Sequence, residues 1–125
     1  VPALTQALQH ESEQVRLRAL DALERIAGSC PEAGAAAAVV LSDHSVEVRA
    51  EAVRLVGQLR DPAHRATLLP LLGDPDPRVR SRTALALFAL RPEAPELVPG
   101  LITALEDPRE DQAVRAAEAL AWLAQ

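Results

Sequence analysis

The chain of 125 residues contains no tyrosine, methionine, lysine or asparagine, and it has one phenylalanine, one tryptophan and one cysteine. Because aromatic and β-branched residues favour strands, their scarcity argues against a β-sandwich or a barrel. The single cysteine, Cys30, cannot form an internal disulfide, which favours a reducing compartment such as the cytoplasm. No apolar run approaches the roughly 18 residues of a membrane span, so no membrane partner is expected.

The residues that are present favour helices. The sequence holds 25 alanines and 20 leucines, and all 13 of its basic residues are arginine. The formal net charge of −5 disfavours nucleic acid as a partner, because nucleic-acid binding needs a basic surface. The length is that of one domain. Since the chain starts at Val1 and contains no methionine, we expect it to be part of a longer polypeptide or a processed product.

Internal repeats are the main feature of the sequence. A Val-Arg pair occupies positions 15–16 and recurs at 48–49 and 79–80, 33 and then 31 residues further on. In a fourth segment two alignments compete. Val114-Arg115 matches the pair only with inserted residues, whereas Asp107-Pro108 aligns with 74–75 without a gap. We take the ungapped register, which places the four anchors at 15, 48, 79 and 112.

Each repeat has room for two helices joined by short turns, which makes the two antiparallel. The expected first helices are 2–9, 32–42, 62–72 and 95–106, and the expected second helices are 12–27, 45–60, 76–91 and 109–124. The sequence therefore predicts an all-α fold, an α-solenoid of four antiparallel helix pairs. The expected single domain is 1–125, with repeats of about 1–30, 31–61, 62–92 and 93–125.

The second helices carry the predicted core. On a helical wheel, the anchor and positions +4, +7, +8 and +11 fall in one narrow stripe. Its members are Val15, Ala19, Ala22, Leu23 and Ile26; Val48, Ala52, Leu55, Val56 and Leu59; Val79, Thr83, Ala86, Leu87 and Leu90; and Gln112, Ala116, Ala119, Leu120 and Leu123. No single pair of helices can bury this stripe, so neighbouring repeats must stack.

This pattern resembles the HEAT repeat family, specifically its short bacterial form. The resemblance is carried by Asp43, Val48, Arg49, Ala52 and Val56, and by Asp74, Pro75, Val79, Arg80, Ala84, Ala86 and Leu87. It implies a ladder in which turn aspartates contact second-helix arginines along the stack. Carried over by position, the ladder comprises Asp43, Asp74 and Asp107 with Arg16, Arg49 and Arg80. Because His10 replaces the first aspartate and Ala113 the last arginine, we expect a weaker ladder at both ends.

The outer face of the second helices resembles the concave wall on which partners of this family dock. At positions +2, +3, +6 and +9 the later repeats combine apolar side chains with arginines, a pattern typical of protein-docking surfaces. The predicted partner-binding residues are Arg54, Arg82, Leu85, Phe88, Val114 and Arg115. The alternative is that Leu85 and Phe88 pack against a tilted neighbouring helix, or against sequence outside this chain. We expect Trp122 to cover the end of the stack or to contact a segment that continues the chain.

The sequence shows no catalytic constellation. His10, His44 and His64 are scattered singly and Cys30 has no nearby thiol, whereas zinc sites need clustered ligands. Acidic pairs such as Glu11 and Glu13 lie at predicted helix starts, where they favour the helix dipole. No glycine-rich phosphate loop is present. We therefore predict no catalytic residues, no metal, no cofactor and no enzymatic activity.

We expect a non-enzymatic scaffold that presents the concave face of the solenoid to another protein. Two alternatives remain. Short repeats of this kind resemble those of phycobilisome chromophore lyases. In a lyase of this type, Arg82 and Arg115 of this chain would hold the propionates of a bilin. The lack of tyrosine weighs against such a pocket. The second alternative is nucleic-acid binding, as in HEAT-like DNA glycosylases. This chain would then bind phosphates through Arg18, Arg54, Arg82 and Arg115. Interleaved acidic residues and the lack of an aromatic platform make this the least favoured alternative.

Overall fold

The regular structure consists of helices only in the computed structural model, which describes residues 2–90 and 95–125. The first two repeats comprise α1 (Pro2–Ala7) with α2 (Glu13–Ile26), and α3 (Ala33–Ala38) and η1 (Val39–Ser42) with α4 (Val46–Leu59). The third comprises η2 (Pro62–His64), α5 (Arg65–Leu68) and η3 (Leu69–Gly73) with α6 (Pro77–Leu90). The fourth comprises η4 (Pro95–Leu97) and α7 (Val98–Ala104) with α8 (Glu110–Leu123). The predicted all-α solenoid is confirmed.

The second helices match their predicted positions closely. Each of α2, α4, α6 and α8 is 14 residues long and begins one residue later than expected. The start of α4 has a clear local cause, because the hydroxyl of Ser45 accepts the backbone N–H of Val48. The expected end of the third second helix at 91, and the expected repeat boundary at 92 to 93, lie outside the described residues.

The first helices differ from the prediction, because α1 ends earlier than expected and the later three are divided between α-helix and 3₁₀ turns. The segment expected as one helix over 62–72 consists of two 3₁₀ turns that flank the four residues of α5. Pro70 explains the second break, since proline lacks an N–H and its ring clashes with the carbonyl four residues before. The side chain of Asp61 caps the start of this segment by accepting the N–H of Ala63 at 2.9 Å.

The core follows the predicted stripe of the second helices. Val48, Ala52, Val79 and Leu87 are all buried, and so is Gln112 at the fourth anchor. By contrast, the side chain of Val114, the anchor of the competing alignment, is 47% exposed. The burial therefore agrees with the ungapped register.

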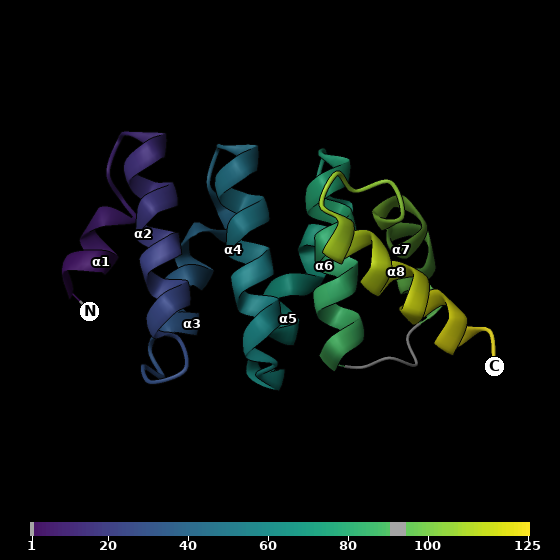
Figure 1. The fold of residues 1–125 in the computed structure, drawn as a ribbon. Helices are drawn as coiled ribbons and strands as arrows, with labels where there is room; N and C mark the ends of the chain where they lie inside the picture. Colours follow the sequence, from purple (N-terminus) through teal and green to yellow (C-terminus); the bar gives the residue numbers. More distant parts are fainter. Residues whose placement is uncertain (1, 91–94) are drawn as a thin grey trace.

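The repeats stack side by side, with α2, α4 and α6 standing next to one another in Figure 1 and the first helices packed against them. Small residues allow this close packing. A Cβ atom built on Gly57 of α4 would lie 2.7 Å from the Cβ atom of Ala86 in α6, and one on Gly100 would lie 2.6 Å from that of Ala84. The last helix breaks the pattern, because α8 runs obliquely across α6 and packs against both α6 and α7 (Figure 1).

None of the helices in the described ranges is both long and apolar enough to span a bilayer.

Candidate functional site

The turn aspartates have the same local geometry in three repeats. The carboxylate of Asp43 accepts the N–H of Ser45 at 2.8 Å. Asp74 and Asp107 likewise accept the N–H two residues further on, each at 2.9 Å. Such turns fix the carboxylate at the start of a second helix, which places it beside the preceding repeat.

The first two arginines of the expected ladder contact these carboxylates. Arg16 lies 2.8 Å from Asp43, and Arg49 lies 2.9 Å from Asp74. Each guanidinium also donates to the carbonyl six residues before it in its own repeat, at 2.8 Å for Arg16 and 2.9 Å for Arg49. Each arginine therefore holds its own turn and joins it to the next repeat.

The third contact differs from the expectation. Arg80 donates to the carbonyl of Asp74 at 2.7 Å and so holds its own turn, but it does not contact Asp107. Arg82 lies 3.2 Å from the carboxylate of Asp107 instead. The oblique course of α8 across α6 explains the change, because it brings Asp107 opposite a residue two positions further along α6.

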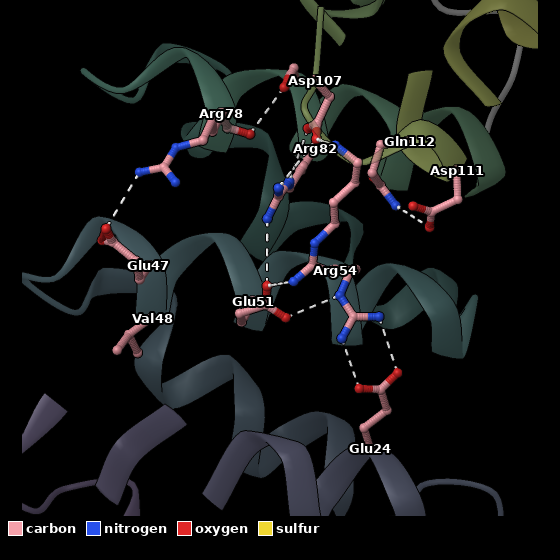
Figure 2. A network of polar contacts seen from close by, with 12 residues as sticks. Glu24, Glu47, Val48, Glu51, Arg54, Arg78, Arg82, Asp107, Asp111 and Gln112 are labelled. Carbon is pink, nitrogen blue, oxygen red and sulfur yellow. Dashed lines mark hydrogen bonds and ion pairs between the residues drawn. The ribbon is translucent and has the colours of Figure 1, made fainter. Parts of the chain in front are cut away.

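Charged side chains of alternating sign connect the four repeats along α2, α4, α6 and the turn before α8, a surface that we call the second-helix face (Figure 2). The members of this network are Glu24, Glu51, Arg54, Arg82, Asp107 and Arg109. Arg54 lies 2.7 Å from Glu24 and 3.1 Å from Glu51. Arg109 lies 2.7 Å from Glu51, which connects the fourth repeat to the second.

The network changes the electrostatics of its members. The side-chain hydrogen bonds from Arg54 hold the pKa of Glu24 below its usual range, and the pairing raises the pKa of Arg54 further above its usual value. Arg54 and Arg82, both predicted to bind a partner, are only 14% and 6% exposed and contact carboxylates of the chain itself. In the structure they join repeats together.

The predicted apolar residues do not form one exposed patch. Leu85 is 3% exposed and belongs to the core, so its expected exposure is wrong. Phe88 is half-buried, and its ring meets that of Trp122 edge-on with the centroids 5.9 Å apart and the planes at 81°. These two side chains are covered because α8 packs obliquely against this part of α6, as the alternative of a tilted neighbouring helix expects. Val114 is exposed on α8.

A groove of about 400 Å³ remains in the angle between α6 and α8, beside the end of α4. Its apolar wall consists of Leu85, Phe88, Ala89, Ala119 and Trp122. Three charged residues complete the lining: Arg60, Arg115 and Glu118. The groove has the volume of a typical binding site and combines an apolar wall with a few polar groups.

The groove brings together three of the six predicted partner-binding residues, namely Leu85, Phe88 and Arg115. It adds Trp122 and Arg60, which the prediction left out of that set. Trp122, expected to cover the end of the stack or to contact a segment that continues the chain, lies edge-on against Phe88 here. The sequence gives no indication that Arg60 lines the groove. Arg60 lies just beyond the last predicted core position of α4, and the direction of its side chain depends on how that helix ends.

Arg60 ends α4 in the left-handed conformation, with φ 52° and ψ 35°. Its N–H donates to the carbonyl of Gly57 at 3.3 Å, which closes the last turn. Glycine usually occupies such a position, because a Cβ atom makes left-handed backbone costly by about 1–2 kcal/mol. The conformation turns the chain at the edge of the groove and leaves Arg60 lining it.

The histidines and the cysteine lie apart from the groove. His10 accepts the N–H of Ser12 at 3.0 Å, and His64 lies 4.0 Å from Asp61. The thiol of Cys30 donates to Glu32 at 3.0 Å, and this hydrogen bond raises the pKa of the thiol, which opposes thiolate formation. Within residues 2–90 and 95–125, no three His, Cys, Asp or Glu side chains are grouped so that they could hold a metal ion.

Comparisons with known proteins agree with the architecture. A family model described as HEAT repeats matches residues 34–121, and one described as HEAT repeat matches residues 1–30. No curated protein matches the chain significantly. Among solved structures, that of human deoxyhypusine hydroxylase in complex with glycerol is similar, with a TM-score of 0.64 and 29% sequence identity. The match covers 99% of this chain and 44% of that one, so this chain spans less than half of its length.

Proposed function

Because the chain belongs to the HEAT repeat family, we propose that it is a non-enzymatic scaffold that binds another protein in the groove between α6 and α8. The observation that carries the proposal is the exposed aromatic wall of this groove. Trp122 is 45% exposed and is stacked edge-on against Phe88, in a groove bordered by arginine. Tryptophan and arginine are the residues that most often dominate the binding energy of protein interfaces.

The chemistry of the groove supports binding more than catalysis. Its described lining residues include no serine, threonine, cysteine or histidine, and Glu118 is their only carboxylate. A nucleophile held beside a base, which covalent catalysis needs, is therefore not found among them. The single cysteine of the chain supports a cytoplasmic location for the scaffold.

The proposal is tested by affinity capture from extracts of the cells that express the chain, with captured proteins quantified by mass spectrometry. The test variant is Trp122→Ala, which removes an exposed side chain of the groove. A charge at Leu85 is unsuitable, because that side chain is buried and the variant would disturb the core. The matched control is Arg18→Gln, on exposed surface of α2.

We expect at least one protein to be captured by the wild type and by Arg18→Gln but lost with Trp122→Ala, and to bind again one-to-one after purification. Circular dichroism must show the same helicity for all three forms. If every captured protein is retained by Trp122→Ala, docking in the groove is wrong.

The likeness to human deoxyhypusine hydroxylase favours a second candidate, a role within a larger enzyme. Incubation of the whole protein with a deoxyhypusine-containing protein, followed by mass spectrometry, separates the two candidates. Hydroxylated product that disappears on mutation of this chain would replace the scaffold proposal. Unchanged substrate together with groove-dependent capture would retain it.

A further inference from the structure

Most charged side chains of the second-helix face form ion pairs with other residues of the chain. Arg54 is held by Glu24 at 2.7 Å, and Arg82 is held by Asp107 at 3.2 Å. Arginines that are paired in this way cannot attract a partner without breaking contacts of the fold. The arginines that matter for recognition are therefore those that remain unpaired.

Two unpaired arginines meet at the groove. Neither the guanidinium of Arg60 nor that of Arg115 forms an ion pair or hydrogen bond with any residue in the part of the chain that the structure describes. They come from different elements, the end of α4 and the middle of α8, and both line the same groove. Against them stands one exposed acidic residue of the lining, Glu118.

The local excess of positive charge stands in contrast to the chain as a whole, whose net charge is −5. The net charge of the chain disfavours an acidic partner, whereas two arginines against one glutamate favour it at the groove. In the same groove, the edge-on pair of Phe88 and Trp122 offers an apolar surface, of which Trp122 is 45% exposed. The lining of the groove is therefore complementary to a ligand that has both carboxylates and a large apolar side chain.

We propose that the groove between α6 and α8 binds a short acidic peptide segment of a partner protein, whose carboxylates contact Arg60 and Arg115 while a leucine or phenylalanine lies against Phe88 and Trp122. This inference rests on the proposed function and specifies the chemistry of the partner. Charge complementarity is its main support, since guanidinium groups bind carboxylates in planar, two-point geometry.

The backbone at Arg60 supports the same assignment. A residue with a Cβ atom occupies a left-handed position where glycine would be less strained. Strained positions of this kind are concentrated at functional sites. Arg60 is also one of the two unpaired arginines of the groove. Its guanidinium therefore has a role at this position that glycine, without a side chain, could not fill.

The chain provides its own probe for the test. Trp122 is its only tryptophan and tyrosine is absent, so intrinsic fluorescence reports on the groove alone. A synthetic peptide in which Asp and Glu alternate with Leu and Phe is titrated into the full chain. We expect a saturable blue shift of the emission and weaker acrylamide quenching as Trp122 becomes covered. The shift weakens with added salt. Peptides with Asn and Gln, or with Lys, at the acidic positions are the matched ligands.

The variants give predictions of opposite sign. Arg115→Gln weakens binding of the acidic peptide by about tenfold, the change that accompanies the loss of about 1.4 kcal/mol. Glu118→Gln strengthens binding by roughly threefold, because it removes the repelling carboxylate of the lining. Arg18→Gln, on the exposed surface of α2 outside the groove, leaves binding unchanged.

Several results overturn the proposal. These are equal binding of the amide peptide, an unchanged affinity in Arg115→Gln, or a Trp122 shift caused by a single-stranded oligonucleotide and not by the peptide. A shift that grows with protein concentration in the absence of peptide would instead indicate that a second copy of the chain covers the groove. If capture from extracts depends on Trp122 but the acidic peptide fails to bind, the scaffold function stands and only the acidic chemistry is wrong.

Discussion

The guanidinium of Arg82 lies 3.2 Å from the carboxylate of Asp107, whereas the position equivalent to Arg16 and Arg49 in this repeat is that of Arg80. A displacement of two residues along α6 accompanies the oblique packing of α8. The side chain of Asp107 is 0% exposed and that of Arg82 6%. The fourth repeat is therefore held to the third by a buried ion pair in a different register.

The first prediction concerns this pair. Arg82→Leu leaves the buried carboxylate of Asp107 without its cation, so we expect the free energy of unfolding to fall by about 3 kcal/mol. Arg80→Leu removes hydrogen bonds to the carbonyls of Asp74 and Pro75, at 2.7 and 3.0 Å, and costs about 1 kcal/mol. Urea unfolding measures both. A larger loss in Arg80→Leu would contradict the register, and adding Asp107→Asn to Arg82→Leu recovers part of the loss.

The second prediction concerns pH. The hydrogen bonds from Arg54 lower the pKa of Glu24 in the folded state. The stability that Glu24 contributes is therefore fully present above its unfolded pKa of about 4.3 and is lost as the pH falls through the lower folded value. Because Glu24 is one-third exposed, we expect an effect below about 1 kcal/mol. Urea midpoints from neutral to acidic pH fall less in Glu24→Gln than in the wild type. The control Glu118→Gln, which removes an exposed glutamate outside the network, follows the wild type.

The third prediction concerns helix contact. Alanine normally stabilises a helix relative to glycine by about 1 kcal/mol, but in Gly57→Ala the new methyl would lie 2.7 Å from the Cβ atom of Ala86. Separating α4 from α6 to make room costs about 1–3 kcal/mol, so we expect a lower melting temperature. Gly28→Ala is the control, since a Cβ there meets nothing within 4 Å and the melting temperature stays the same or rises slightly. A more stable Gly57→Ala would show that these helices separate readily.

The fourth prediction concerns the left-handed residue. Arg60→Gly relieves the backbone strain and raises the free energy of unfolding by about 1 kcal/mol. Arg60→Ala keeps a Cβ atom in the same conformation and stays within about 0.5 kcal/mol of the wild type. Thermal unfolding distinguishes the two. Both variants bind the acidic peptide more weakly, so Arg60→Gly is more stable and binds less. Equal stabilisation in Arg60→Ala would mean that the conformation stores no strain.

Much of the fold could be predicted because each second helix repeats one local pattern. The anchors at Val15, Val48 and Val79 define the register, and the buried Gln112 shows that an ungapped alignment outweighed the visible Val-Arg pair just after it. The breaks in the first helices were harder to place. Their cause at Pro70 is local, but several short 3₁₀ turns satisfy the same apolar pattern as one continuous helix.

The groove was only partly predictable, because its shape depends on the angle of one helix. A helical wheel assigns Leu85 and Phe88 to the outer face of α6 and assumes that neighbouring repeats stack in the same orientation. In the structure α8 crosses α6, which buries Leu85 and brings Trp122 against Phe88. The angle results from the summed packing of α7 and α8 on α6, which no single motif encodes. Arg54 and Arg82 were misjudged for a similar reason, since their carboxylate partners come from other repeats.

The contact of Arg109 with Glu51 has a consequence for cooperativity. It joins residues 58 positions apart and passes over the third repeat, whereas solenoids are usually held together by contacts between adjacent repeats alone. In a purely nearest-neighbour chain, the terminal repeat can fray without disturbing the middle. Here, loss of the fourth repeat also removes a partner from Glu51 and perturbs the pairing of Arg54 with Glu24 beyond it. The chain is therefore expected to unfold more as a single unit than as a row of independent repeats.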